Sequence, residues 1–241
     1  MLESGSYRRG AVVGSWLVQT PIAHRGSFDN LVVPENSLAA FQASIDRSLP
    51  IELDVYVSAD GVPVVFHDGD LLRLTGSAGK VTDFTAGELT KLRLFGTEER
   101  LPLLADVLEL VSGRVPLLIE LKTHAPRVGR LERAVVEALK GYSGEAALQS
   151  FNPLSVGWLL RHAPGFLRGQ LASGPAGPPP RSAAKADFVA YRVEDLPNPA
   201  VTRLRERGIP IIAWTVRSAE QKAPAMAYAD NYIFEDEGSG R

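Results

Sequence analysis

Short apolar runs alternate with amphipathic segments along most of this chain. Runs of four to eight apolar residues bounded by turn residues predict buried strands, and apolar residues recurring every three or four positions predict helices. The predicted strands are 21–23, 51–57, 62–66, 115–121, 146–150, 166–171, 188–191, 209–216 and 231–234. The predicted helices are one through 39–45 and those at 106–111, 127–140, 153–161, 199–207 and 218–225.

The repeated strand–helix order predicts a parallel sheet covered by helices. Seven or eight such repeats in 241 residues favour closure into a (β/α)₈ TIM barrel, and we expect a single domain over residues 1–241. Residues 68–101 are rich in glycine with only short apolar pieces, which predicts an insertion at the mouth of the barrel. Residues 174–180 carry too much glycine and proline for a regular element.

The end of the pattern is irregular. The chain continues for about seven residues after the last predicted strand, which leaves no room for the final helix of the barrel. We therefore expect that helix to be missing, or the first twenty residues to cover the gap.

Composition narrows the class of protein. With 45% hydrophobic and 22% charged residues the chain has ample material for a core, and a net charge of -2 gives no basic field for a nucleic-acid partner. The absence of cysteine excludes disulfides, thiolate zinc sites and cysteine nucleophiles. Residues 11–18, after Arg8 and Arg9, faintly resemble a signal peptide, but this apolar stretch is short and runs almost directly into His24. We therefore expect a cytoplasmic protein and leave export open. No segment approaches the ~20 apolar residues of a membrane span.

Carboxylates interrupt two of the predicted strands. Glu52 and Asp54 alternate with apolar residues and therefore share one face of their strand, as do Glu120 and Lys122 on a later strand. Three carboxylates without a thiolate suit a hard cation, Mg²⁺ or Ca²⁺. Ion pairing with a core arginine explains the first pair equally well, and a salt bridge at the strand end explains the second.

Two histidines stand at strand ends near these carboxylates. His24 and His67 are best interpreted as a general acid/base pair, whereas His124 and His162 lack such a setting and are assigned to structure or surface. Arg25 can bind a phosphate through its guanidinium.

Three further residues have open roles. Glu35 and Asn36 lie in a loop that can orient His24 or the metal ligands, although Asn36 is equally well explained as a helix cap. Trp214 can form a wall of the pocket or simply pack at the barrel rim.

These residues together resemble the glycerophosphodiester phosphodiesterase family. The matching stretches, which extend from residue 21 to about 235, are Ile22–Gly26, Pro34–Phe41, Glu52–Val55, Asp60–Asp68, Leu71–Gly76, Leu101–Leu104, Ile119–Lys122, Ser150–Phe151 and Ala213–Val216. The resemblance implies a (β/α)₈ barrel that cleaves glycerophosphodiesters, such as glycerophosphocholine, to glycerol 3-phosphate and an alcohol.

The resemblance also implies roles for single residues. It implies a divalent metal ion held at Glu52, Asp54 and Glu120, and catalytic histidines at His24 and His67. It further implies phosphate contacts from Arg25 and Lys122 and a pocket aromatic at Trp214.

The sequence departs from the family pattern on the far side of the pocket. Arg217 stands where the family usually has asparagine, and Phe234-Glu235-Asp236 replaces a Thr-Asp-like pair followed by proline. Two alternatives therefore stay open. One is a phosphodiesterase for lysophospholipids or another phosphodiester, and the other is a barrel that binds a phosphorylated ligand without cleaving it.

Overall fold

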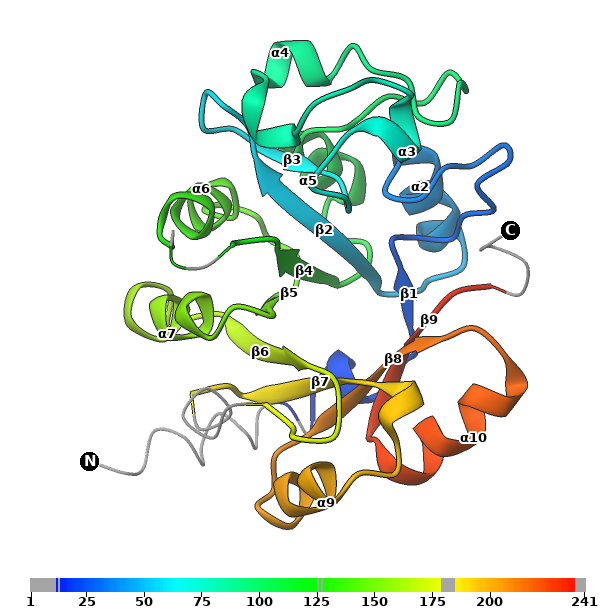
Figure 1. Cartoon of the computed structure of the whole chain (residues 1–241), viewed down its shortest axis with the longest axis vertical. Helices are drawn as coiled ribbons and strands as arrows, with labels where there is room; N and C mark the ends of the chain where they lie inside the picture. Colours follow the sequence, from blue (N-terminus) through cyan, green and yellow to red (C-terminus); the bar gives the residue numbers. More distant parts are fainter. Residues whose placement is uncertain (1–11, 13, 125, 127, 179–184, 237–241) are drawn as a thin grey trace.

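The computed structural model describes residues 12, 14–124, 126, 128–178 and 185–236. Within this part of the chain, eight parallel strands close into a barrel because β1 pairs with both β2 and β9 (Figure 1). Around the barrel the strands are β1 (Ile22–His24), β2 (Ile51–Val57), β4 (Leu117–Leu121), β5 (Ala146–Ser150), β6 (Leu167–Ala172), β7 (Phe188–Arg192), β8 (Ile211–Val216) and β9 (Asn231–Phe234). The short strand β3 (Pro63–Val65) pairs antiparallel with β2. The predicted TIM barrel is confirmed.

Helices surround the outside of the barrel (Figure 1). They are α2 (Leu38–Asp46), α5 (Leu104–Val111), α6 (Arg130–Ala138), α7 (Pro153–His162), α9 (Pro199–Glu206) and α10 (Ala219–Tyr228). One-turn 3₁₀ segments are η1 (Trp16–Val18), η2 (Val81–Asp83) and η3 (Val193–Asp195). Several helices begin where the sequence predicts, because Ser37, Asn152, Asn198 and Ser218 accept hydrogen bonds from backbone N–H groups of the first turn.

Residues alternate along β2 and β4, so that apolar side chains face the helices and acidic side chains face the interior of the barrel. Ile51, Leu53 and Val55 point outward and pack with helices α2, α5 and α6 in the largest apolar cluster. Glu52 and Asp54, on the other face of β2, point into the barrel. The same alternation on β4 directs Glu120 into the barrel. The packing of the apolar residues against the helices therefore determines that the acidic residues face inward.

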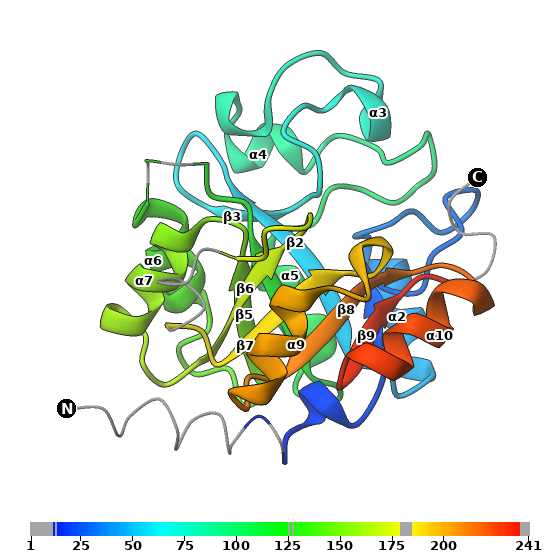
Figure 2. The same ribbon diagram turned by 60° about the horizontal axis from the view of Figure 1, so that its bottom comes forward.

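The N-terminal end of the barrel is closed from below. Val12, Trp16 and Leu17 pack with inward-facing residues of the strands, among them Leu118 and Ile233. Figure 2 shows η1 at this end, opposite the insertion. The described part of the first twenty residues therefore plugs the bottom of the barrel and does not stand in for a helix on its side. No helix follows β9 in residues 235–236, and residues 237–241 lie outside the described residues.

The insertion has a small core of its own. It contains α3 (Leu72–Thr75), η2 and α4 (Ala86–Leu89), which lie at one end of the barrel in Figures 1 and 2. Leu74, Val81 and Leu89 pack there with Tyr56 of β2 and Phe66. This second core attaches the insertion to β2, the strand that carries two of the predicted metal ligands.

The predicted element boundaries are mostly close to those observed. β2, β5 and β9 have the predicted limits, whereas α10 continues three residues beyond Ala225. Residues 173–178 form no helix or strand, as expected, and residues 179–184 of the loose segment lie outside the described residues.

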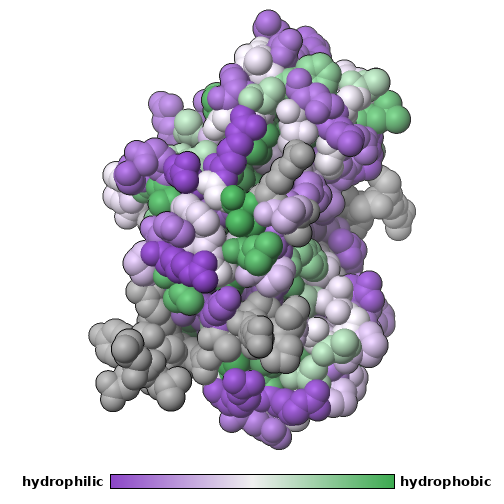
Figure 3. All heavy atoms as spheres, turned by 60° about the vertical axis from the view of Figure 1, so that its left-hand side comes forward, coloured by the Kyte–Doolittle hydropathy of each residue, from purple (hydrophilic) through white to green (hydrophobic). Residues whose placement is uncertain are grey.

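On the face shown in Figure 3, hydrophobic residues form small patches among mainly hydrophilic side chains. No helix in the described ranges is long and apolar enough to cross a membrane.

Candidate active site

The three carboxylates predicted as metal ligands meet at the C-terminal end of the barrel. Glu52 and Asp54 come from β2 and Glu120 from the adjacent β4, where Asp54 and Glu120 are partners in register. One carboxylate oxygen of each lies within 4.8 Å of the others, and all three residues are buried. Carboxylate oxygens at this separation form a site suited to a hard divalent cation.

Two cations contact this cluster. The Lys122 ammonium lies 2.8 Å from both Asp54 Oδ1 and Glu120 Oε1. The Arg25 guanidinium lies 3.3 Å from Asp54 Oδ2, and it also donates to Glu35 at 2.7 Å. The ion pairs considered in the sequence analysis are therefore present, and they involve the two residues expected to contact phosphate.

The ion pairs leave the cluster short of positive charge. Glu52 contacts no lysine or arginine side chain within the described residues; it accepts only the Arg25 backbone N–H at 3.3 Å and lies 3.9 Å from His24 Nε2. Burial, with the charges of Asp54 and Glu120, raises the pKa of Glu52 well above its usual range. Burial also raises the pKa of Glu120 to about 7, despite the nearby ammonium. A divalent cation would relieve this repulsion.

His24 extends from the end of β1 toward the cluster. Its Nδ1 lies 2.6 Å from Glu235 Oε1, and its Nε2 faces Glu52. Burial lowers the pKa of His24 to about 4, because the charge of Arg25 adds to the desolvation and the Glu235 carboxylate only partly offsets both. Burial therefore favours the neutral form of His24, which can accept a proton.

His67 follows β3 and stands at the start of the insertion. Its Nδ1 lies 2.6 Å from Asp68 Oδ1, and Asp68 accepts from Arg73 Nε at 2.6 Å. Arg73 also donates to both oxygens of Glu35, at 2.7 and 3.0 Å. Burial lowers the pKa of His67, while the charge of Asp54 opposes this shift. The insertion thus fixes the second histidine through a network that returns to the loop after β1.

Asn36 supports the cluster instead of capping a helix. Its side chain donates to Asp54 Oδ2 at 2.9 Å and accepts the Asp54 backbone N–H at 3.3 Å. The cap of α2 is Ser37, whose hydroxyl accepts from the backbone N–H of Ala40. Asn36 therefore orients Asp54, and the two alternatives left open by the sequence are resolved in favour of the site.

A cleft of about 430 Å³ opens beside these groups. Its lining residues are Tyr56, His67, Asp68, Gly69, Asp70, Glu120, Leu121, Lys122, Thr123, His124, Ser150 and Phe151. Trp214, on β8, meets Phe151 edge to face with ring centroids 5.5 Å apart, so it supports the far wall through Phe151. His124 also lines the cleft, although the sequence assigned it to structure or surface.

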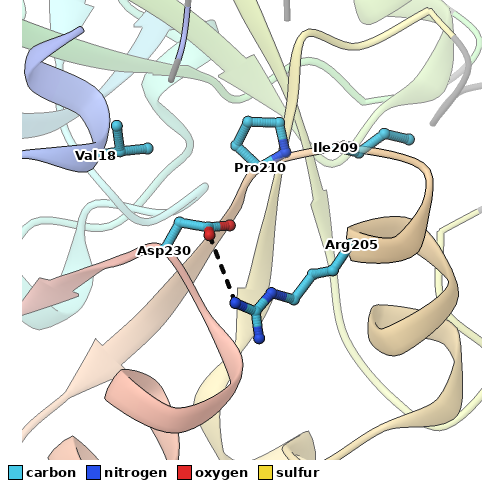
Figure 4. Close-up of a pocket in the computed structure, with 6 residues that line it drawn as sticks. Val18, Arg205, Ile209, Pro210 and Asp230 are labelled. Carbon is cyan, nitrogen blue, oxygen red and sulfur yellow. Dashed lines mark ion pairs between the residues drawn. The ribbon is translucent and has the colours of Figure 1, made fainter. Parts of the chain in front are cut away.

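A second cavity, of about 510 Å³, lies at the opposite end of the barrel. Figure 4 shows Arg205 beside Asp230, with 3.6 Å between their charged groups, together with Val18, Ile209 and Pro210. These residues precede β1, β8 and β9 and lie far from the carboxylates. Neither histidine nor any of the three predicted ligands lines this cavity.

Two contacts of the histidines were not predicted from the sequence. Glu235 is 211 residues from His24, and no local pattern indicates that they meet. Asp68 and Arg73 lie inside stretches that matched the family, but neither was assigned a role. A carboxylate directly after His67 was the one signal available in the sequence for a partner of that histidine.

The buried acidic cluster and the two imidazoles lie at the C-terminal mouth of the barrel, where enzymes with this fold carry their active sites. Residues 24–235 match the model of the glycerophosphoryl diester phosphodiesterase family. A glycerophosphodiester phosphodiesterase of Caldanaerobacter subterraneus is 32% identical over 230 residues, which cover 89% of this chain and 93% of that protein. The chain belongs to this family of phosphoric diester hydrolases, and the predicted enzyme class is confirmed.

Solved structures support the fold. A phosphodiesterase of Oleispira antarctica, in complex with the product sn-glycerol-3-phosphate, has a TM-score of 0.81 at 24% identity and covers 92% of this chain and 94% of its own. A glycerophosphodiester phosphodiesterase of Thermotoga maritima has a TM-score of 0.70 at 24% identity, with 90% and 94% covered. The barrel is therefore shared along almost the whole length of both proteins.

Proposed function

We propose that the protein hydrolyses glycerophosphodiesters to glycerol 3-phosphate and an alcohol, with a divalent metal ion held by Glu52, Asp54 and Glu120. The observation that carries the proposal is the buried triad of carboxylates, which lies beside His24 and has too few cations to balance it. Family membership supports the reaction class. The Oleispira phosphodiesterase, solved with sn-glycerol-3-phosphate, supports glycerol 3-phosphate as the product.

The donor set fits a hard cation. All three ligands offer carboxylate oxygen and none offers sulfur, which suits Mg²⁺ or Ca²⁺. When bound, the metal would withdraw charge from the phosphate oxygens. Arg25 and Lys122 already contact the carboxylates, so they lie where they can hold a phosphate beside them.

The two histidines would move the protons. The nucleophile is water, or the substrate's own glycerol 2-hydroxyl, whose attack gives a cyclic phosphate that water then opens to glycerol 3-phosphate. One histidine accepts a proton from the nucleophile as the new P–O bond forms. The other donates a proton to the alkoxide as the old P–O bond breaks. Each has its Nδ1 beside a carboxylate, His24 beside Glu235 and His67 beside Asp68, which leaves Nε2 for this work. Trp214 and Phe151 would cover the far side of the substrate.

The test uses metal-stripped protein and glycerophosphocholine. Mg²⁺, Ca²⁺ and Mn²⁺ are added back separately, and released glycerol 3-phosphate is measured. We expect release only with metal, and the most effective ion names the cofactor. Release of choline from lysophosphatidylcholine, with no glycerol 3-phosphate from glycerophosphocholine, would replace this proposal with a lipid phosphodiesterase. Tight binding of glycerophosphocholine without cleavage would replace it with a non-catalytic barrel.

A further inference from the structure

A series of contacts outside the acidic cluster of Glu52, Asp54 and Glu120 leads to His24. Glu235, which follows β9, lies with Oε1 2.6 Å from His24 Nδ1. Arg217, which follows β8, donates through Nε to Glu235 Oε2 at 2.8 Å and through Nη2 to Oε1 at 2.9 Å. The Glu235 side chain is 6% exposed and that of Arg217 47% exposed. The two positions at which the sequence departs from the family pattern therefore contact each other.

This arrangement decides which nitrogen of His24 carries the proton. An ionised carboxylate can only accept a hydrogen bond, so Glu235 requires the proton to sit on Nδ1. The Nε2 atom then carries the lone pair, and it faces Glu52 Oε2 at 3.9 Å. The paired arginine keeps Glu235 ionised and fixes both of its oxygens.

We propose that Glu235 is a positioning residue for His24. It holds the imidazole in the Nδ1–H tautomer with Nε2 directed at the acidic cluster, and Arg217 holds Glu235 in that orientation. The inference rests on the proposed function, because it gives His24 the geometry that an acid/base role requires.

The other histidine offers an internal comparison. His67 has the same kind of partner, since Asp68 lies 2.6 Å from its Nδ1 and is itself held by Arg73. In both cases a carboxylate fixes the histidine and an arginine fixes the carboxylate. The sources differ, because Asp68 is the next residue along the chain and Glu235 comes from the opposite end of the barrel sequence.

A purely structural role for Glu235 makes different predictions. A salt bridge that only ties β8 and β9 to β1 would lower the melting temperature, the metal affinity and substrate binding together. A positioning role lowers kcat while KM and the metal affinity stay close to wild type, because the ligands and the phosphate contacts are untouched.

The experiment compares Glu235→Ala and Glu235→Gln with Asp236→Asn as the matched control. Asp236 is the next carboxylate and pairs with Arg47, away from the histidines. We expect Glu235→Ala to lower kcat by about 10- to 100-fold, with KM, metal Kd and melting temperature close to wild type. Glu235→Gln keeps an oxygen that can accept from Nδ1, so its loss should be smaller. Asp236→Asn should turn over as wild type.

A second measurement needs no turnover. The ¹⁵N shifts of the His24 ring at pH 7.5 should show Nδ1 protonated in the wild type and in Glu235→Gln, and a shift toward the Nε2–H tautomer in Glu235→Ala, which has no acceptor at this position. A wild-type ring protonated on Nε2 overturns the inference, as does an alanine variant with unchanged kcat or one that loses metal affinity and stability together. If the alanine variant does not fold, the glutamine variant decides by the same criteria. If the wild type lacks activity, the proposed function fails while the ring shifts still decide whether Glu235 positions His24.

Discussion

Glu52 and Asp54 are two residues apart on one strand, yet their carboxyl groups hold protons very differently. Lys122 and Arg25 contact Asp54 and keep its pKa well below the usual range, although burial opposes this. Glu52 has no such partner side chain within the described residues, so burial and its acidic neighbours raise its pKa. At the scale of single residues, the surroundings favour the ionised form of Asp54, whereas Glu52 needs a nearby cation to favour its ionised form.

The first prediction concerns the histidines. His24→Ala and His67→Ala should each lower turnover of glycerophosphocholine by about 10²-fold or more, because each removes an acid/base group. His162→Ala is the control, since that ring stacks on Trp158 at the outside of the barrel. Near-normal turnover in either of the first two variants would remove that histidine from the mechanism.

The second prediction concerns the metal ligands. Glu52→Gln should weaken metal binding by about tenfold or more, since losing a ligand charge should cost at least as much as losing an outer-shell partner. Isothermal titration of Mg²⁺ or Ca²⁺ into the metal-stripped variant measures this. Glu137→Gln is the control, because Glu137 lies at the exposed end of α6 and pairs with Lys140 just beyond it, so this variant should bind metal as wild type. Equal affinity in both variants would mean that Glu52 is not a ligand.

At the scale of elements, the loop after β1 can approach α2 closely because a glycine without a side chain lies at the contact. Gly26 has φ +81°, and a Cβ there would lie 2.8 Å from the backbone carbon of Ala40. The close approach places Arg25 over the acidic cluster, where its backbone N–H reaches Glu52. A small residue at the strand end therefore positions a large one in the site.

The third prediction follows from this packing. Gly26→Ala should lower the free energy of unfolding by about 1–3 kcal/mol, because it adds a clash with backbone to an unfavourable φ. Gly76→Ala is the control, since its φ is +69° but no atom lies within 4 Å of the added Cβ. Urea denaturation of both variants separates the clash from the φ effect. Equal losses in the two would show that α2 moves aside.

The elements were predictable where local chemistry determines them. β2 has its predicted limits because outward Ile51, Leu53 and Val55 alternate with inward acids and a turn follows. Helix α6 is shorter than predicted at both ends, since it begins after Gly129, which has φ +107°, and ends at Ala138. The role of Asn36 was not predictable, since both it and Ser37 are good caps and only the folded chain brings Asp54 beside one of them.

At the scale of the whole molecule, the three proposed ligands, Glu52, Asp54 and Glu120, come together only when β2 and β4 pair in the barrel. A metal ion that binds this arrangement and not the unfolded chain stabilises the fold by mass action. The protonated state of Glu120 opposes binding, because its pKa is raised to about 7 and a ligand must release its proton.

We expect metal binding to stabilise the fold, and this stabilisation to depend on pH. An ion at about 100 times its Kd should add about 2.7 kcal/mol of stability, and EDTA should remove it. Burial raises the pKa of Glu120 to about 7 in the metal-free protein, so metal binding at pH 6 must displace a proton from this carboxyl group. The metal affinity should therefore rise as the pH increases through 7. Melting temperatures with and without Mg²⁺ or Ca²⁺ at pH 6 and pH 8 check this. A larger increase at pH 6 than at pH 8 would contradict the assigned ligand.

The contact between His24 and Glu235 also orders events during synthesis on the ribosome. Both histidines and all three carboxylates are translated by residue 120, but Glu235 is delivered 211 residues after His24. A nascent chain, or one truncated before β9, therefore carries the reactive groups without the carboxylate that aligns His24. If Glu235 acts as proposed, efficient cleavage of phosphodiesters begins only once translation has passed the last strand, and unfinished chains are poor catalysts.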